Sequence, residues 1–178
     1  RFTNVSIQSN TNVSMLGMGI AVGDYNEDGW LDYYVTNIST NVLLKNNQDG
    51  TFENAIEGSG CESTGWDMID KSTGEEGHVA VIGWGANFFD YDHDSYLDLF
   101  VSNGSLNPLV EGTTTIDTSH NANALYRNKG DATFEWVENS GLGHETRGRG
   151  SVTFDYDKDG DLDILVVVQN NFEGYTCI

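Results

Sequence analysis

The chain has 178 residues, of which 28 are acidic and 8 are basic, so that its formal net charge is −20. Such acidity repels the phosphates of nucleic acids and of anionic membranes, and argues against both as partners. No apolar run approaches the length of a membrane span, and 21 glycines with a single proline indicate a folded chain with many tight turns.

Short strand patterns follow one another from the N-terminus. Residues 2–7 alternate apolar and polar side chains, which predicts a first β-strand. Residues 19–22 and 33–35 predict two strands that flank an acidic turn. Residues 42–46 and 52–56 predict two more, joined by a turn that contains the hairpin signal Asp-Gly. We name the four strands of such a repeat A, B, C and D, and residues 2–7 then match an isolated strand D.

An acidic loop of nine residues lies between strands A and B. In the third copy, Asp155, Asp157, Asp159 and Asp163 stand at positions 1, 3, 5 and 9, with Gly160 at position 6, where the turn is sharpest. Alternate carboxylates and a backbone carbonyl at position 7 are the oxygen ligands that Ca²⁺ prefers. Position 12 is valine instead of the glutamate of an EF-hand, and a strand pattern follows. The sequence therefore predicts calcium held in a β-hairpin.

The loop occurs three times, with first ligands 66 and 65 residues apart. We therefore expect about three bound Ca²⁺ ions, which would offset the mutual repulsion of the carboxylates. Trp30, Tyr96 and Asp161 would contribute backbone carbonyls. The predicted ligands are Asp24, Asn26, Asp28, Trp30 and Asp32 in the first loop, Asp90, Asp92, Asp94, Tyr96 and Asp98 in the second, and Asp155, Asp157, Asp159, Asp161 and Asp163 in the third.

Two loops depart from the pattern of the third. Asn26 replaces a carboxylate in the first loop, which lowers its charge, and Ser95 replaces the turn glycine of the second loop. If the turn keeps its shape, Ser95 adopts a left-handed backbone conformation that is unfavourable for a residue with a side chain. We therefore expect the third loop to bind calcium most tightly.

The strand order also repeats. Four short antiparallel strands in a period of about 65 residues are typical of a propeller blade. The predicted fold is all-β, with four-stranded antiparallel blades of β-propeller type and calcium-binding hairpin loops. We expect one repeat domain over residues 1–178, in which residues 1–18 hold the last strand of a preceding blade and a loop, residues 19–84 the first blade, residues 85–149 the second blade and residues 150–178 part of a third.

Each complete repeat carries one insertion of about 16 residues, between strands D and A around residues 61–84 and between strands B and C around residues 106–123. In an up-and-down blade, both connections lie on the face opposite the calcium loops. Long loops on a rigid scaffold often carry function, so this face is the candidate recognition surface, although its side chains are equally typical of solvated loops. The candidate ligand contacts there are Trp66, Asp67, Asp70, His78, Glu111, His120 and His144.

Other sequence features bear on location and chemistry. Asn4, Asn12, Asn37 and Asn103 begin Asn-x-Ser sequons, and these predicted glycosylation sites, together with calcium loops, indicate an extracellular protein. Cys61 and Cys177 either form a disulfide, within or between chains, or remain free. The histidines lack the spacing of a zinc site.

Enzyme signatures are missing from the sequence, which contains no Gly-x-Ser-x-Gly elbow, phosphate loop or dinucleotide fingerprint. Glycosidase chemistry needs two carboxylates at a suitable separation, but most carboxylates here are assigned to calcium. The expected protein is therefore not an enzyme.

The loop Phe-Asp-Tyr-Asp-x-Asp-Gly-x-Leu-Asp, the following apolar strand, the motif Leu-Tyr-x-Asn and a Gly-x-x-Thr-Phe-like turn resemble the FG-GAP or VCBS repeat. That repeat occurs in integrin alpha chains and in secreted proteins similar to cartilage acidic protein. The resemblance covers nearly the whole chain and implies a calcium-stabilised propeller for extracellular adhesion or structural assembly, with another extracellular protein or a glycan as partner. The alternative is a carbohydrate-binding propeller in which Trp66 stacks on a sugar.

The number of predicted strands is too small for a closed propeller. With residues 175–178 as a further strand C, the chain has strands for three blades, whereas propellers usually close with four to eight. Either the chain is an excerpt of a longer protein, or strand D of another copy completes its third blade. The second alternative would give a ring or filament by strand addition.

Overall fold

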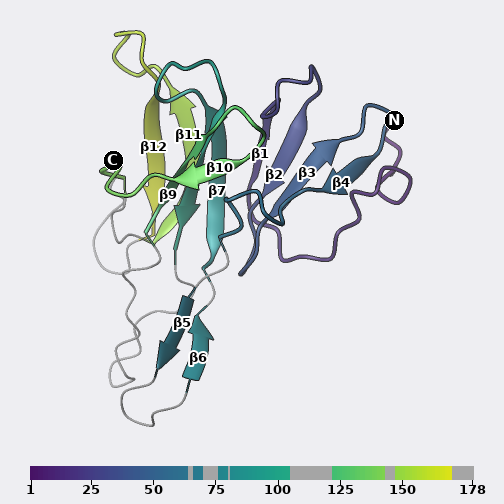
Figure 1. Ribbon diagram of the computed structural model, residues 1–178, viewed down its shortest axis with the longest axis horizontal. Helices are drawn as coiled ribbons and strands as arrows, with labels where there is room; N and C mark the ends of the chain where they lie inside the picture. The colour runs from purple at the N-terminus through teal and green to yellow at the C-terminus, as the bar shows by residue number, and fades with distance from the viewer. Residues whose placement is uncertain (64–65, 70–75, 80, 105–121, 143–146, 170–178) are drawn as a thin grey trace.

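The computed structural model describes residues 1–63, 66–69, 76–79, 81–104, 122–142 and 147–169. All regular elements within these residues are β-strands. Two four-stranded sheets and one two-stranded sheet lie side by side, and a separate hairpin extends from one end of the molecule (Figure 1). A helix of the length and apolarity needed to cross a membrane is not found in the described part.

Each four-stranded sheet is an antiparallel meander with its strands in sequence order. The first sheet contains β1 (Ile20–Gly23), β2 (Asp32–Val35), β3 (Val42–Asn46) and β4 (Phe52–Asn54). The second sheet contains β7 (Gly83–Phe89), β8 (Asp98–Asn103), β9 (Ala124–Asn128) and β10 (Phe134–Trp136). The third contains β11 (Gly148–Phe154) and β12 (Asp163–Val168), and the separate hairpin contains β5 (Trp66–Ile69) and β6 (Glu76–Val79). The all-β prediction with four-stranded antiparallel sheets is confirmed.

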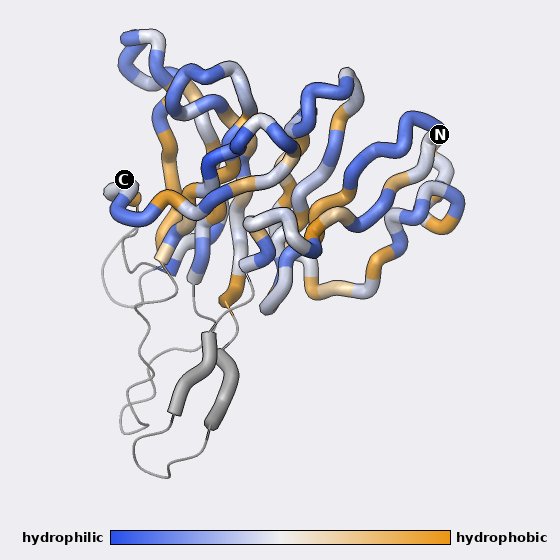
Figure 2. Tube along the Cα trace, viewed as in Figure 1, coloured by the Kyte–Doolittle hydropathy of each residue, from blue (hydrophilic) through white to orange (hydrophobic). Residues whose placement is uncertain are grey.

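The core lies between the faces of neighbouring sheets. Tyr34 and Leu43 of the first sheet pack with Leu99 and Val101 of the second in one buried cluster. A second cluster joins Phe89, Phe100 and Leu125 of the second sheet to Val166 and Val168 of the third. All six residues of β8 are buried because this strand faces both clusters. Figure 2 shows the consequence: apolar stretches follow the strands, and polar stretches fill the turns at their ends.

The first strands of the three sheets lie next to one another. β1 contacts β7, and β7 in turn contacts β11. Sheets that meet along their first strands, with their faces packed together, have the arrangement of blades in a propeller. The described part of the chain is therefore a row of propeller-like blades.

Glycines permit this close approach of strands from different sheets. A Cβ atom at Gly19 would lie 1.9 Å from the carbonyl oxygen of Trp84. At Gly85, the same position in the second repeat, a Cβ would lie 2.5 Å from Ser151 Oγ and 2.6 Å from its backbone nitrogen. Gly150 holds the corresponding place in the third repeat, and a Cβ there would meet nothing within 4 Å. The first two glycines are thus needed for packing between blades.

The strand predicted over residues 2–7 is wrong. Residues 6–10 form turns, in which the Ser9 N–H donates to the Val5 carbonyl at 2.9 Å. The cause is local, because Asn4 Oδ1 accepts hydrogen bonds from both the backbone N–H and the hydroxyl of Ser6. Such a side-chain acceptor competes with strand pairing.

The insertion around residues 61–84 contains the β5–β6 hairpin, where the sequence suggested only a loop. The strand predicted over residues 175–178 lies outside the described residues.

We predict that Gly85→Ala destabilises the protein by about 1–3 kcal/mol, because the new methyl group would clash with the backbone and hydroxyl of Ser151. Gly150→Ala is the matched control in the same repeat position, and in dilute, monomeric protein it should be neutral within about 0.5 kcal/mol. Urea unfolding of the 178-residue chain measures both. Equal losses for the two variants would contradict the assignment of Gly85 to the contact between blades.

Candidate metal centres

Three acidic loops join the first two strands of the three sheets, at the same end of the molecule (Figure 1). Antiparallel pairing fixes how each loop closes. Gly23 pairs with Asp32, Phe89 with Asp98 and Phe154 with Asp163, so that the residue before the first predicted ligand faces the ninth position across the ladder. The two ends of each predicted ligand set are thereby brought together.

The three loops share one backbone conformation, with positive φ at positions 4 and 6. At position 6, Gly29 has a φ of 88°, Ser95 of 75° and Gly160 of 100°. The turn therefore keeps its shape despite the serine, and the predicted left-handed conformation of Ser95 is confirmed. Position 4 has the same property, in Glu27, His93 and Lys158.

Hydrogen bonds inside the loops fix the direction of the carboxylates. Asp90 Oδ1 accepts from the Asp94 N–H at 3.1 Å, and its Oδ2 accepts from the Ser95 N–H at 2.9 Å. Asp94 Oδ1 accepts from the Tyr96 N–H at 2.9 Å. The first loop repeats all three bonds around Asp24 and Asp28. Backbone donors thus hold the carboxylates at positions 1 and 5 toward the inside of each loop.

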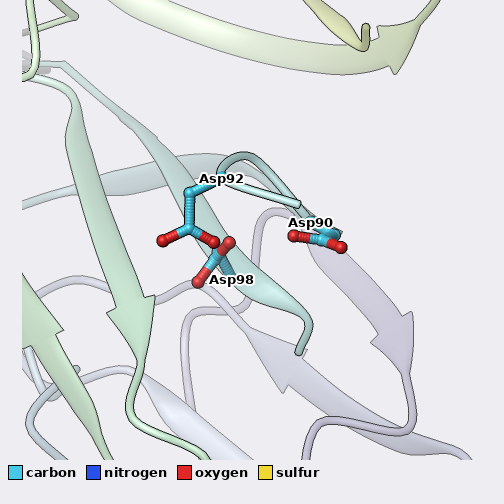
Figure 3. A group of neighbouring side chains, drawn as sticks. All are labelled: Asp90, Asp92 and Asp98. Atoms are coloured by element: carbon cyan, nitrogen blue, oxygen red, sulfur yellow. The ribbon is translucent and has the colours of Figure 1, made fainter. Parts of the chain in front are cut away.

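Carboxylates gather closely in two of the loops. Oxygen atoms of Asp90, Asp92 and Asp98 all lie within 4.8 Å of one another (Figure 3), although the three residues come from both ends of the second loop. Asp155, Asp157 and Asp159, at positions 1, 3 and 5, form a second such group in the third loop. Several hard oxygen atoms at this separation match the ligand set of Ca²⁺.

The ninth position places a carboxylate in the protein interior. Asp32 and Asp98 begin β2 and β8, and both are 0% exposed. Asp32 Oδ1 accepts from the Asn46 N–H, and Asp98 Oδ1 from the Asn128 N–H, each at 2.8 Å. Asp32 Oδ2 is also buried and makes no well-formed hydrogen bond among the described residues, although the Tyr25 N–H lies close enough to lower the pKa of this carboxyl. A buried oxygen without a well-formed hydrogen bond is costly, and a cation in the loop would satisfy it, so these residues fit a metal.

Burial also shifts the acidity of these two groups. Desolvation, with the charges of Asp28 and Asp24, raises the pKa of Asp32 to about 6, against the lowering effect of the Asn46 and Tyr25 N–H groups. Desolvation likewise raises the pKa of Asp98 to about 6, while the N–H groups of Asn128 and Tyr91 lower it. Both carboxylates are thus unfavourable as anions unless positive charge is supplied.

An asparagine at the end of strand C fastens each of the first two loops. Asn46 Nδ2 donates to the Leu31 carbonyl at 3.2 Å, and Asn128 Nδ2 donates to the Leu97 carbonyl at 3.0 Å. Asn128 also donates to the Tyr25 carbonyl of the first loop at 2.8 Å, which links two blades. The sequence analysis missed this role, although the recurrence of asparagine in the strand C motif was a usable signal.

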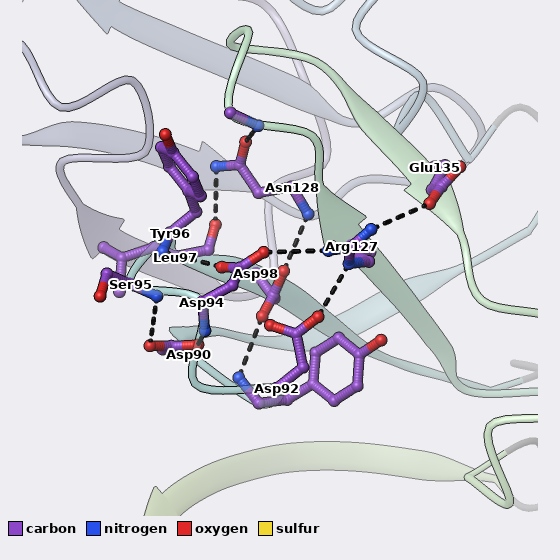
Figure 4. Close-up of polar contacts among 12 residues, drawn as sticks. Asp90, Asp92, Asp94, Ser95, Tyr96, Leu97, Asp98, Arg127, Asn128 and Glu135 are labelled. Carbon is purple, nitrogen blue, oxygen red and sulfur yellow. Dashed lines mark hydrogen bonds and ion pairs between the residues drawn. The ribbon is translucent and has the colours of Figure 1, made fainter.

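Arg127 on β9 was also missed by the sequence analysis. Its guanidinium donates from Nε to Asp92 Oδ2 at 2.8 Å and from Nη2 to Asp94 Oδ2 at 3.1 Å (Figure 4). A longer ion pair of 3.7 Å joins it to Glu135. Nothing in the local sequence pattern places an arginine against carboxylates 33 and 35 residues away.

The candidate ligand face is only partly described. Trp66 and His78 lie on β5 and β6, at the end of the molecule opposite the acidic loops (Figure 1). The backbone register places Asp67 opposite His78. The remaining candidates lie outside the described residues: Asp70, Glu111, His120 and His144.

Among the described residues Cys61 has no disulfide partner; it is buried, its Sγ lies 3.2 Å from Ser59 Oγ, and burial raises the pKa of its thiol to about 12. Cys177 lies outside the described residues, so the disulfide stays a prediction.

The four sequons differ in exposure. Asn4 and Asn12 are exposed. Asn37 is partly buried, and its amide donates to the Thr40 carbonyl at 3.0 Å. Asn103 is only 2% exposed, and its amide donates to the Ala122 carbonyl at 2.8 Å. A glycan needs an amide that faces solvent, so the burial of Asn103 counts against it as an acceptor.

Fold and loops together define a class: an all-β protein of propeller-like blades, each with an acidic loop between its first two strands. A model of the FG-GAP-like repeat matches residues 24–101 and 113–166, and these ranges include all three loops. The chain therefore belongs to the FG-GAP-like repeat family. A search of curated proteins finds no match.

The raised pKa values of Asp32 and Asp98 predict an unusual pH dependence without metal. Because the folded-state pKa of about 6 exceeds the value of about 3.9 in an unfolded chain, the folded protein binds more protons between them. In EDTA, the melting temperature should therefore rise by a few degrees as the pH falls from about 7 to about 5. Thermal unfolding followed by circular dichroism measures this change.

Asp32→Asn is the control for that experiment. It removes the charge, and its amide oxygen still accepts from the Asn46 N–H, so the metal-free variant should be more stable at neutral pH and depend less on pH. Asp98→Asn should gain less, because both oxygens of Asp98 accept well-formed backbone hydrogen bonds and an amide offers only one oxygen. A melting temperature that falls steadily from pH 7 to pH 5 would contradict the assignment.

Proposed function

We propose that the chain is a non-catalytic, calcium-binding extracellular module for adhesion or structural assembly, and that each acidic loop holds one Ca²⁺. The observation that carries the proposal is the buried Oδ2 of Asp32, which makes no well-formed hydrogen bond, in a loop where backbone donors hold Asp24 and Asp28 inward. Positions 1, 3, 5 and 9 would supply side-chain oxygens. Trp30, Tyr96 and Asp161 at position 7 would supply carbonyls.

Bound calcium would supply positive charge to the loop and would not take part in catalysis. The role of the protein's own residues is to hold oxygens in place: backbone donors orient Asp24 and Asp90, and strand C fixes Asp32 and Asp98. A cation that binds the first and ninth positions would lock each loop to the two strands that it joins. This supports a stabilising role, because the metal binds the folded state far better than the unfolded chain.

The family supports the remainder of the proposal. FG-GAP-like repeats are generally non-catalytic and occur typically in extracellular or surface-exposed proteins that contact other proteins. The end of the molecule that carries β5 and β6 lies away from the acidic loops and leaves the metal sites free to serve stability (Figure 1). We assign recognition of an extracellular protein partner to that end.

We predict that calorimetric titration finds about three calcium ions per chain, and that Asp159→Ala lowers this number by about one. Calcium should raise the melting temperature of the wild type by at least several degrees, because binding stabilises only the folded state. Glu57→Ala removes one exposed acidic side chain outside the loops and is the matched control. Failure of the wild type to bind calcium would remove the proposed mechanism and leave the fold assignment intact.

Assembly is supported by the tyrosine at loop position 2. Tyr25 of the first loop is 2% exposed and stacks on Phe88 and Phe134 of the second sheet, with ring centroids 6.3 and 5.7 Å away. Tyr91 of the second loop packs against the cluster shared with the third sheet. Tyr156, its equivalent in the third loop, is 75% exposed. The third sheet thus offers the face that the first two sheets bury.

We propose that this face takes a further blade of the same kind, supplied in homo-oligomers by a second copy. Apolar side chains that support it are exposed on and around β11 and β12: Val152, Phe154, Leu162 and Val167. Gly150, with open space at its Cβ position, leaves room for the approach that Gly85 makes to Ser151.

We predict that the protein assembles in the presence of calcium. Its molar mass, measured by light scattering, should then rise with protein concentration. Phe154→Ser, which reduces the exposed apolar surface, should shift the protein toward monomer. Glu138, which follows β10 of the second sheet, is also exposed, and the control variant Glu138→Ser should leave the molar mass unchanged. A wild type that stays monomeric at high concentration would count against assembly through this face.

A further inference from the structure

A positively charged side chain of the protein itself pairs with the second acidic loop. Arg127 extends from β9 and places two nitrogens of its guanidinium on Asp92 and Asp94, the predicted ligands at positions 3 and 5 (Figure 4). The distances are 2.8 and 3.1 Å, and both carboxylate side chains are only 25% exposed. Charge-assisted hydrogen bonds from one planar fork to two carboxylates are strong and fix the geometry of both.

The first loop lacks this arrangement although its sequence context is the same. Lys45 stands at the position of Arg127, one residue before the strand C asparagine, but its Nζ pairs with Glu53 on β4 at 3.5 Å. Asp28 at position 5 receives a neutral donor, Gln48 Nε2, at 3.3 Å. The loop carboxylates of the second repeat are therefore paired with a charged donor, whereas Asp28 of the first repeat accepts from a neutral one.

The buried ninth ligand shows the same difference independently. Both oxygens of Asp98 accept backbone hydrogen bonds, from Asn128 at 2.8 Å and Tyr91 at 3.0 Å. Asp32 Oδ2 makes no well-formed bond of this kind among the described residues, and the Tyr25 N–H has a smaller effect on this carboxyl than the Asn46 N–H has. Groups of the protein itself thus satisfy the carboxylates of the second loop more fully than those of the first.

We propose that Arg127 is an internal counter-ion that partly replaces the metal at the second loop. This inference rests on the proposed calcium binding and adds a ranking of the calcium affinities of the three loops. Arg127 stabilises the second loop without metal, and an entering Ca²⁺ meets carboxylates whose charge is already partly neutralised. The second loop therefore binds Ca²⁺ most weakly of the three, and the second blade keeps its shape when calcium is scarce.

The test uses a chain in which only the second loop is intact. Asp28→Ala and Asp159→Ala together disable the first and third loops, and calorimetry then measures calcium binding to the second loop with Arg127 or with Arg127→Gln. Loss of the guanidinium should tighten calcium binding on the order of tenfold. Lys45→Gln in the same background is the matched control and should leave the affinity unchanged.

A second measurement does not depend on calcium binding or on the double variant. In EDTA, Arg127→Gln in the otherwise unaltered chain should lower the melting temperature more than Lys45→Gln does, and Arg127→Lys should restore part of the loss. Equal effects of the two glutamine variants would overturn the proposal, as would unchanged or weaker calcium binding after Arg127→Gln. If no loop of the wild type bound calcium, the proposed function would fail, and the EDTA comparison would still decide the role of Arg127.

Discussion

One buried carboxylate at the ninth position of each of the first two loops holds the repeat together. Asp32 begins β2, faces Gly23 of β1 across the ladder and accepts a hydrogen bond from Asn46 of β3. Asp98 has the same connections in the second sheet. Each of these residues thus connects three strands, because its backbone pairs with the first strand and its side chain bonds the third. Its burial is costly for an anion, which is why the loop needs a source of positive charge.

The repeats depend on each other through contacts that recur at the same positions. A glycine at the start of the first strand lets β7 approach β1, and another lets β11 approach β7. The tyrosine after the first acidic residue fills the space between sheets beside these strands. Backbone approach and aromatic packing therefore act together, and the first two acidic loops contribute their tyrosines to the contact between blades. Stabilising a loop should consequently stabilise the contact below it.

Electrostatics distinguish loops that look alike in sequence. All three loops have the same turn and the same alternate spacing of oxygen atoms. The first leaves a buried oxygen of Asp32 without a well-formed hydrogen bond, and the second pairs Asp92 and Asp94 with Arg127. In the third, Asp163 is exposed and bonds the Tyr156 N–H at 2.8 Å. The protein has a net charge of −20, and in each loop the repulsion between carboxylates is offset by nearby hydrogen-bond donors or, in the second loop, by Arg127.

The sequence by itself determined the loops, their spacing and the strands beside them, because alternation of side chains and turn residues is a local property. It failed at residues 2–7, where the Asn4 side chain captures the backbone that alternation assigns to a strand. It did not indicate that Arg127 reaches Asp92, or that Asn128 bonds the carbonyl of Tyr25. Only the tertiary structure decided these contacts, because they depend on which strands become neighbours and on which face of the sheet each side chain leaves.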